Sequence, residues 1–180
     1  LDLNCGGNDN CSVIGFANET NLFAVVTDAS ITGSGNGLGG LVGSGDSRLS
    51  INESYFQGEV LGAGTGIGGL VGSFNGSLEV QSSAVYLDKI TGFDDIGGFV
   101  GQFYSGGSGN TLNITDSYIN FDDKGQHAGD NFNGSEGYQM GVLFGYVANG
   151  LTGEVKNVYM DTTKLAAIGN ADVNSSYGVG

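Results

Sequence analysis

The residues of this chain that could support acid–base or nucleophilic chemistry are few and scattered. His127 is the only histidine, so a Ser-His-Asp triad would have to use it, and no Gly-x-Ser-x-Gly turn accompanies it. Adjacent carboxylates occur at Asp94-Asp95 and Asp122-Asp123, but neighbours in a strand point to opposite faces and make a poor acid–base pair. The five Lys and Arg residues are spread along the chain, whereas a polysaccharide lyase would gather them around its developing anion. We therefore predict a protein that is not an enzyme.

One acidic loop offers oxygen ligands for calcium, a cation that takes six to eight of them. The predicted ligands are Asp122, Asp123 and Asp130. The loop matches neither an EF-hand nor the Gly-Gly-x-Gly-x-Asp repeat, so a solvated acidic loop with no cofactor is the alternative. Aromatic side chains flank it, and aromatics on irregular loops are good candidates for recognising a sugar or a protein. The predicted binding residues are Phe103, Tyr104, Asp122, Asp123, His127, Asp130, Phe132 and Tyr138.

Two features concern covalent modification. Cys5 and Cys11 are six residues apart and fit no zinc signature. We predict a local disulfide formed in an oxidising compartment, and two free thiols are the alternative. Seven Asn-x-Ser/Thr sequons suggest glycosylation of an exposed surface, although turn-rich sequences favour the same residue types. The sequons are at Asn10, Asn18, Asn52, Asn75, Asn113, Asn133 and Asn174.

The bulk composition narrows the classes of partner. The formal net charge of −14 would repel nucleic acid and anionic membrane surfaces. No stretch approaches the 18 apolar residues of a membrane-spanning helix, so membrane insertion is not expected. The first residues do not resemble a signal peptide, so we expect that a secreted form has already lost one. Glycine makes up 36 of the 180 residues, which indicates a backbone that turns often or approaches another backbone closely.

An internal repeat must position these residues. Gly39-Gly40-Leu41-Val42-Gly43 recurs 29 residues later at 68–72 and again at 97–101, and a looser copy at 141–145 follows after 44 residues. Leu38, Ile67 and Ile96 follow the same 29-residue spacing, as do Ile31, Val60 and Lys89, where only the lysine breaks the apolar pattern. The spacing of the fourth copy predicts 15 additional residues, which we expect as loops.

Within each unit, apolar and polar residues alternate, as in Arg48-Leu49-Ser50-Ile51-Asn52, which is the pattern of a half-buried strand. One unit of short strands cannot bury its apolar face alone, but stacked units can. We predict an all-β fold, a parallel β-solenoid of about five coils with a repeat of about 29 residues. It forms a single domain over 1–180, in which 1–19 is an N-terminal cap with the disulfide. Residues 20–160 hold the repeats, with insertions in 102–139, and 161–180 form a degenerate last coil.

The Gly-Gly-Leu-Val-Gly segment, followed by a strand that ends in Ser-Tyr, resembles the GLUG-motif repeats. The best matches are Ile67–Gly72 and Asn52-Glu53-Ser54-Tyr55, and the resemblance covers about residues 20 to 160. The fourth unit departs from the pattern, because Gly141-Val142 replaces the glycine pair. This resemblance implies an extracellular protein of bacterial surfaces with a binding or spacer role, and it implies no catalytic residues.

Three functions are compatible with these features. The first is a non-enzymatic adhesion or binding module, secreted or at the cell surface, that recognises a glycan or a cell-surface protein through its inserted loops. The second is a structural subunit of an extracellular filament or matrix, in which copies join end to end through unpaired strand edges. The third is a polysaccharide-cleaving β-helix enzyme.

Overall fold

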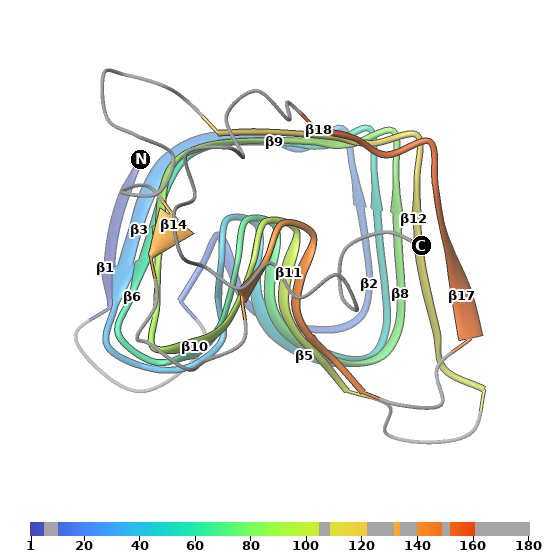
Figure 1. Cartoon of the computed structure of the whole chain (residues 1–180), viewed down its shortest axis with the longest axis horizontal. Helices are drawn as coiled ribbons and strands as arrows, with labels where there is room; N and C mark the ends of the chain where they lie inside the picture. Colours follow the sequence, from blue (N-terminus) through green and yellow to red (C-terminus); the bar gives the residue numbers. More distant parts are fainter. Residues whose placement is uncertain (6–10, 105–108, 122–131, 134–139, 149–151, 161–180) are drawn as a thin grey trace.

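The computed structural model describes residues 1–5, 11–104, 109–121, 132–133, 140–148 and 152–160. Within these ranges the chain is all β, without a helix, and its strands pair in parallel into three sheets that wind into a β-solenoid (Figure 1). About three full turns carry a strand in every sheet. The predicted parallel β-solenoid is confirmed, whereas these turns do not by themselves establish a count of five.

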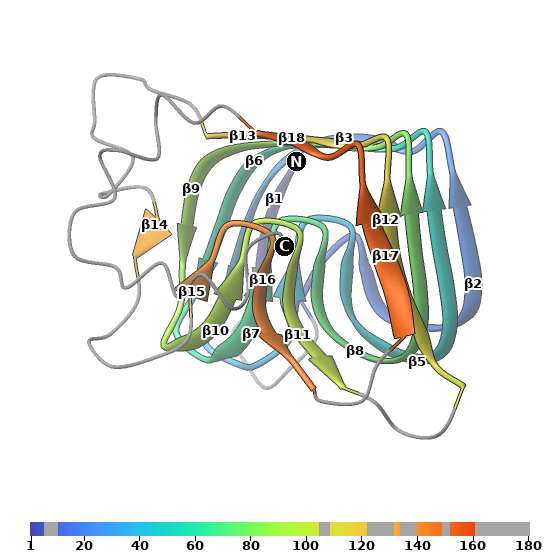
Figure 2. The ribbon, with the colours of Figure 1, turned by 45° about the vertical axis from the view of Figure 1, so that its right-hand side comes forward.

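We label the three sheets A, B and C. Each turn of the chain contributes a strand to sheet C, then to sheet B and then to sheet A, and successive turns stack along one axis (Figure 2). Sheet A contains β1 (Asp2–Cys5), β3 (Val26–Gly33), β6 (Tyr55–Gly62), β9 (Ala84–Thr91), β13 (Tyr118–Phe121) and β18 (Tyr159–Met160), with β14 (Phe132–Asn133) also paired to β9. Sheet C contains β4 (Leu38–Gly39), β7 (Thr65–Gly68), β10 (Asp94–Gly97) and β15 (Met140–Gly141). Sheet B contains β2 (Ile14–Phe23), β5 (Val42–Asn52), β8 (Val71–Gln81), β11 (Val100–Tyr104), β12 (Thr111–Thr115), β16 (Phe144–Val147) and β17 (Thr152–Lys156).

The strand register shows the 29-residue spacing in the regular turns. Val42 pairs with Val71, and Val71 pairs with Val100, so both steps are 29 residues (71 − 42 and 100 − 71). All three side chains are fully buried. Stacking of like apolar residues in one column is how each turn closes the core of its neighbour.

The register also locates the additional residues of the next turn. Asn75 and Leu78 are 3 apart, but their partners Tyr104 and Leu112 are 8 apart, which leaves five additional residues. Leu87 and Ile96 are 9 apart, but their partners Phe121 and Met140 are 19 apart, which leaves ten more. The strands on both sides of each insertion remain paired with the neighbouring turn.

One expectation about the repeat is corrected. Lys89 does not follow Ile31 and Val60 in the apolar column, because Val60 pairs with Ile90 and Lys89 pairs with Glu59 on the outer face. The register between β6 and β9 shifts by one residue after Gly58, where β9 holds an extra residue. This bulge keeps the column apolar, since Ile31, Val60 and Ile90 are all fully buried.

The Gly-Gly-Leu-Val-Gly segments form an inward fold, seen in Figure 1 as the bend in the middle of the cross-section between β10 and β11. The second glycine of each pair lies against sheet A: a Cβ at Gly40 would overlap the ring of Phe56, and one at Gly98 would overlap Ile119. The two limbs of the fold also meet backbone to backbone, because a Cβ at Gly97 would overlap Val100 and Gly145 of the opposite limb. The repeated glycine pair therefore exists because no side chain fits at these contacts.

Buried serines connect consecutive turns at the corner between sheets B and A. The amide of Ser54 donates to Ser83 Oγ at 3.1 Å, and the amide of Ser83 donates to Ser117 Oγ at 3.3 Å. These hydroxyls also donate within their own turns, Ser83 to the carbonyl of Gln81 at 2.8 Å. The recurring serine therefore satisfies buried backbone groups at a corner where regular pairing stops.

Two further contacts complete the frame. Tyr86 lies between Tyr55 and Tyr118, with ring centroids 5.2 Å and 5.6 Å away, so the tyrosines form a ladder on the outer face of sheet A. The predicted disulfide is confirmed between Cys5 and Cys11. Cys11 is buried at the first end of the core, so the disulfide ties β1 to the first turn.

Candidate functional site

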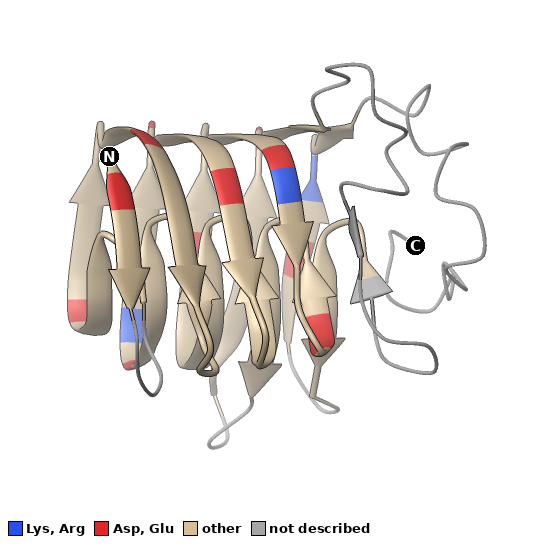
Figure 3. Cartoon of the chain, turned by 90° about the vertical axis from the view of Figure 1, so that its left-hand side faces the viewer, with Lys and Arg blue, Asp and Glu red and all other residues tan. Residues whose placement is uncertain are grey.

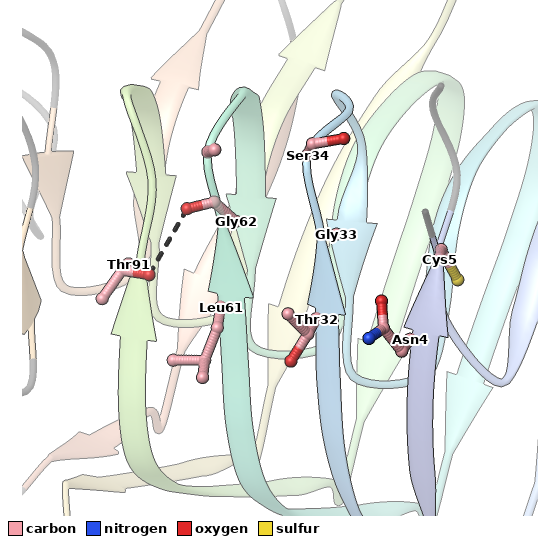
Figure 4. Close-up of a pocket in the computed structure, with 9 residues that line it drawn as sticks. Asn4, Cys5, Thr32, Gly33, Ser34, Leu61, Gly62 and Thr91 are labelled. Carbon is pink, nitrogen blue, oxygen red and sulfur yellow. Dashed lines mark hydrogen bonds between the residues drawn. The ribbon is translucent and has the colours of Figure 1, made fainter. Parts of the chain in front are cut away.

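A groove with a volume of about 330 Å³ crosses the end of sheet A (Figure 4). It runs over β1, β3, β6 and β9, so every one of four successive turns contributes to it. Three strand-to-strand steps of about 4.8 Å make it roughly 14 Å long. The residues that line it are Asn4, Cys5, Thr32, Gly33, Ser34, Leu61, Gly62, Ala63 and Thr91.

The strand register explains why these side chains form one row. Asn4 pairs with Thr32, Thr32 with Leu61, and Leu61 with Thr91, so the four side chains lie beside one another along the solenoid axis. Neighbouring glycines deepen the groove, because a Cβ at Gly62 would lie 2.6 Å from Ile67 Cδ1 in the core. The backbone therefore lies directly on the core at this point, and the surface is hollowed beside the row.

The groove is uncharged, although the protein is strongly acidic. Its polar groups are amide, hydroxyl and backbone groups, and Thr91 Oγ1 donates to the carbonyl of Gly62 at 3.4 Å. Asp2, Glu59 and Lys89 lie two positions earlier on their strands, in a row that they share with Ser30. Figure 3 shows the charged residues of sheet A, which lie outside the groove row. A ligand in the groove would meet hydrogen-bonding and apolar surface without an ionic contact.

One strand from the larger insertion pairs with sheet A at one end of the groove. Phe121 pairs with Leu87 of β9, and β14 pairs with Ile90 and Thr91 of the same strand. Thr91 belongs to the groove row. The site therefore combines a regular row from four turns with a strand from the turn in which the repeat is interrupted.

The residues selected from sequence have different outcomes. Asp122, Asp123, His127, Asp130 and Tyr138 lie outside the described residues, and so does the predicted calcium site; Phe132 lies in β14. Tyr104 ends β11 directly before the first insertion and is 40% exposed.

The expectation for Phe103 needs correction. Its side chain is fully buried and stacks on Phe74, with ring centroids 6.2 Å apart. The alternation of β11 turns Phe103 toward the core and Tyr104 toward solvent, so Phe103 is a core residue that a ligand cannot contact.

The sequons are not equivalent as acceptors of a glycan. Asn18 and Asn75 are exposed, whereas Asn52 is half-buried and donates from Nδ2 to Ser50 Oγ at 2.8 Å. Asn113 accepts from the amide of Glu154 at 3.0 Å. Asn133 lies in β14, and Asn10 and Asn174 lie outside the described residues.

Sequence reasoning missed the groove itself. Thr32 and Leu61 are 29 residues apart, but Leu61 and Thr91 are 30 apart because of the bulge in β9. A search at constant spacing therefore does not align the row. The signal that would have helped is the glycine after Thr32, Leu61 and Thr91, which marks the same corner in three turns.

Comparison with known proteins adds no family to this chain. No family model matches it, and no curated protein or solved structure is significantly similar to it. Over the described residues, no group of three or more His, Cys, Asp or Glu side chains is arranged to hold a metal ion. The same part of the chain contains no helix of the length and hydropathy needed to cross a membrane. The fold and the groove define the class of this protein as a β-solenoid repeat protein with a lateral groove.

Proposed function

We propose that this protein is a non-enzymatic, extracellular binding module that holds a neutral glycan chain in the groove over β1, β3, β6 and β9. The observation that carries the proposal is the uncharged row of Asn4, Thr32, Leu61 and Thr91, which the register aligns along the axis. A polymer of repeating units suits a groove built from repeating turns, because each turn offers an equivalent contact to the next unit.

The chemistry of the row favours a glycan over other extended ligands. Hydroxyl and amide groups donate and accept hydrogen bonds with sugar hydroxyls, and Leu61 offers apolar surface to the face of a sugar ring. The row beside the groove holds two carboxylates, Asp2 and Glu59, and one cation, Lys89, and the whole protein carries a formal charge of −14, so acidic polysaccharides are disfavoured. An uncharged glycan satisfies both conditions.

The inserted residues supply the specificity in this proposal. β14 brings the larger insertion to Thr91 at one end of the groove, and binding residues concentrate on loops that a rigid scaffold positions. We also infer that the solenoid has about five coils of about 29 residues. The strands before and after the three full turns, which do not have a partner strand in every sheet, would belong to the first and last coils. Placement at a bacterial surface, as the GLUG resemblance implies, is part of the same proposal.

The test is affinity electrophoresis of the full chain through soluble neutral glucans, mannans, xylans and galactans. We expect retention by at least one of them, and loss of that retention in Leu61→Arg, which fills the middle of the groove with a long charged side chain. The matched control is Gln81→Arg, which adds the same charge at an exposed position of sheet B. Both variants should melt at the temperature of the parent protein.

Two results would count against the groove. The first is the absence of retention across the whole panel. The second is equal retention of Leu61→Arg and the parent protein.

Removal of ten residues from 124–138 tests the role of the larger insertion. It should weaken binding or change the preference among polysaccharides while leaving the fold intact, because this deletion restores the spacing of the regular turns.

Self-association is the second candidate function, and one observation favours it. Phe16, Phe23 and Val26 of the first described turns are 55%, 64% and 75% exposed, and β2 has a partner in sheet B on one side only among the described strands. An exposed strand edge with apolar side chains can pair with another chain. Sedimentation of the parent and of Phe23→Asn over a range of concentrations would test this, and identical monomeric behaviour of both would exclude it.

A further inference from the structure

A second cluster lies on the inward fold, where the third regular turn departs from the first two. Gly37 and Gly66 adopt positive φ angles of 67° and 68°, and the residue 29 positions further on is Asp95, with φ 53°. Its side chain is 7% exposed. Glycine adopts this conformation without strain, so the aspartate replaces the residue that the backbone prefers.

Two more positions change in the same turn. Gln102 pairs in register with Ser73, and Tyr104 pairs with Asn75. Gln102 Nε2 donates to Asp95 Oδ2, and Ser73 Oγ donates to Gln102 Oε1 at 3.4 Å. Tyr104 contacts Tyr146 of the next turn, with ring centroids 5.8 Å apart and planes inclined by 53°. The three departures from the repeat therefore meet in one place.

The electrostatics of the cluster are unfavourable for an unliganded carboxylate. Burial, and then the neighbouring carboxylate of Asp94, raise the pKa of Asp95 to about 6, and the hydrogen bond from Gln102 only partly opposes this. The pKa of Tyr104 is raised as well. The largest cause is burial, and electrostatic interactions with Asp95 and then with Tyr146 act in the same direction. Among the described residues, the groups that act on Asp95 are Asp94 and Gln102, and neither is a cation. At neutral pH the cluster thus holds a largely buried negative charge with two tyrosine rings nearby.

The repeat itself supplies the comparison that makes this arrangement informative. Glycine and serine occupy the first two of these positions in the preceding turn, and the backbone there has the same register. The preceding turn thus forms the same backbone without Asp95, Gln102 or Tyr104 at these positions, and burial of a carboxylate opposes folding. A buried polar group that destabilises the fold, at a position where the preceding turn has a residue that does not, is a reason to look for a ligand.

We propose that Asp95, Gln102, Tyr104 and Tyr146 form a second binding site, which takes the side chain of a lysine or arginine from a partner protein. A cation beside Asp95 supplies the charge that the described surroundings lack, and it forms a charge-assisted hydrogen bond with the carboxylate. Tyr104, which is exposed, supplies an aromatic ring against which an ammonium or guanidinium group can pack. The excess of negative charge on the whole protein, −14, draws a basic partner toward the site.

The site is separate from the groove on sheet A, and the proposal does not depend on glycan binding. The probe is the peptide tetralysine, titrated calorimetrically into the full chain at pH 7.5 and low ionic strength. We expect Asp95→Gly, which restores the residue of the preceding turns, to weaken binding by about tenfold or more, as the loss of one charge-assisted hydrogen bond predicts. Tyr104→Asn, which also copies the preceding turn, should weaken it by about two- to fivefold.

Matched controls distinguish the site from general attraction between opposite charges. Glu154→Gln removes one negative charge at an exposed position of β17 and should bind tetralysine within about twofold of the parent. Asp95→Asn, which keeps the shape of the side chain, should resemble Asp95→Gly. Equal losses in Glu154→Gln and Asp95→Gly would overturn the proposal, as would unchanged binding in both Asp95 variants. Equally tight binding of tetralysine acetylated on its side chains would also overturn it.

Discussion

Replacement of Asp95 by asparagine tests the electrostatic description of the inward fold through protein stability. Asparagine has the same shape, tolerates a positive φ angle and still accepts a hydrogen bond from Gln102. It differs from aspartate mainly because it cannot ionise. Any effect that depends on pH can then be assigned to the charge of one carboxyl group.

The sign and size of the effect follow from the pKa of Asp95. Burial, together with the charge of Asp94, raises this pKa from 3.8 to about 6 in the folded protein. Well below pH 3.8 the carboxyl is protonated in both the folded and the unfolded chain, so its titration does not change stability. As the pH rises from 3.8 to about 6, the carboxyl of the unfolded chain loses its proton before that of the folded chain. The free energy of unfolding therefore falls over this range and becomes constant above it.

A shift of about two pKa units corresponds to at most about 3 kcal/mol. Gln102 beside the carboxyl is only half-buried, and solvent reaching the cluster screens its charges, so we expect about 1–2 kcal/mol. At pH 7.5, Asp95→Asn should therefore unfold at a temperature roughly 2–8 °C above the parent. At pH 3.5 the two proteins should melt together.

The assay is thermal unfolding followed by circular dichroism at both pH values, and the measured quantity is the difference between parent and variant. Carboxyl groups far from Asp95 contribute equally to both proteins and cancel from this difference. A difference that is the same at pH 3.5 and pH 7.5 would refute the reasoning. So would destabilisation by asparagine at pH 7.5, because the carboxylate would then stabilise the fold.

Two other predictions test the frame that holds these sites. Gly98→Ala should destabilise the protein by about 2 kcal/mol or more in chemical denaturation, because its Cβ would overlap Ile119 and the carbonyl of Val142. Gly33→Ala should destabilise it less, because the nearest contact of its Cβ is 3.1 Å away, at the end of the Leu38 side chain. Ser83→Ala should cost about 1–3 kcal/mol, because it leaves the buried amide of Ser54 without its acceptor. The exposed Ser34→Ala is the control for Ser83→Ala, and equal midpoints for these two variants would contradict the role of the buried serines.

The outcome for the individual residues shows what local pattern can and cannot predict. The 29-residue spacing of Leu38, Ile67 and Ile96 predicted equivalent positions in successive units, and these residues are paired and buried. The same constant spacing misassigned Lys89, because a single extra residue in β9 places Ile90 in the column with Val60. Phe103 was selected for its position beside an insertion, but the alternation of its strand, and not its nearness to a loop, determines its burial.

The sequence by itself determined the class of fold, the disulfide and the residues of the repeating core. It did so because a parallel solenoid stacks each unit on the next, so that a periodic pattern along the chain becomes a column in space. Only the tertiary structure decided which side chains meet across the surface. The groove row depends on a register shift, and the cluster at Asp95 depends on the two limbs of the inward fold lying back to back. Neither contact is encoded in the period of the chain, because both join residues whose separation departs from it or crosses between sheets.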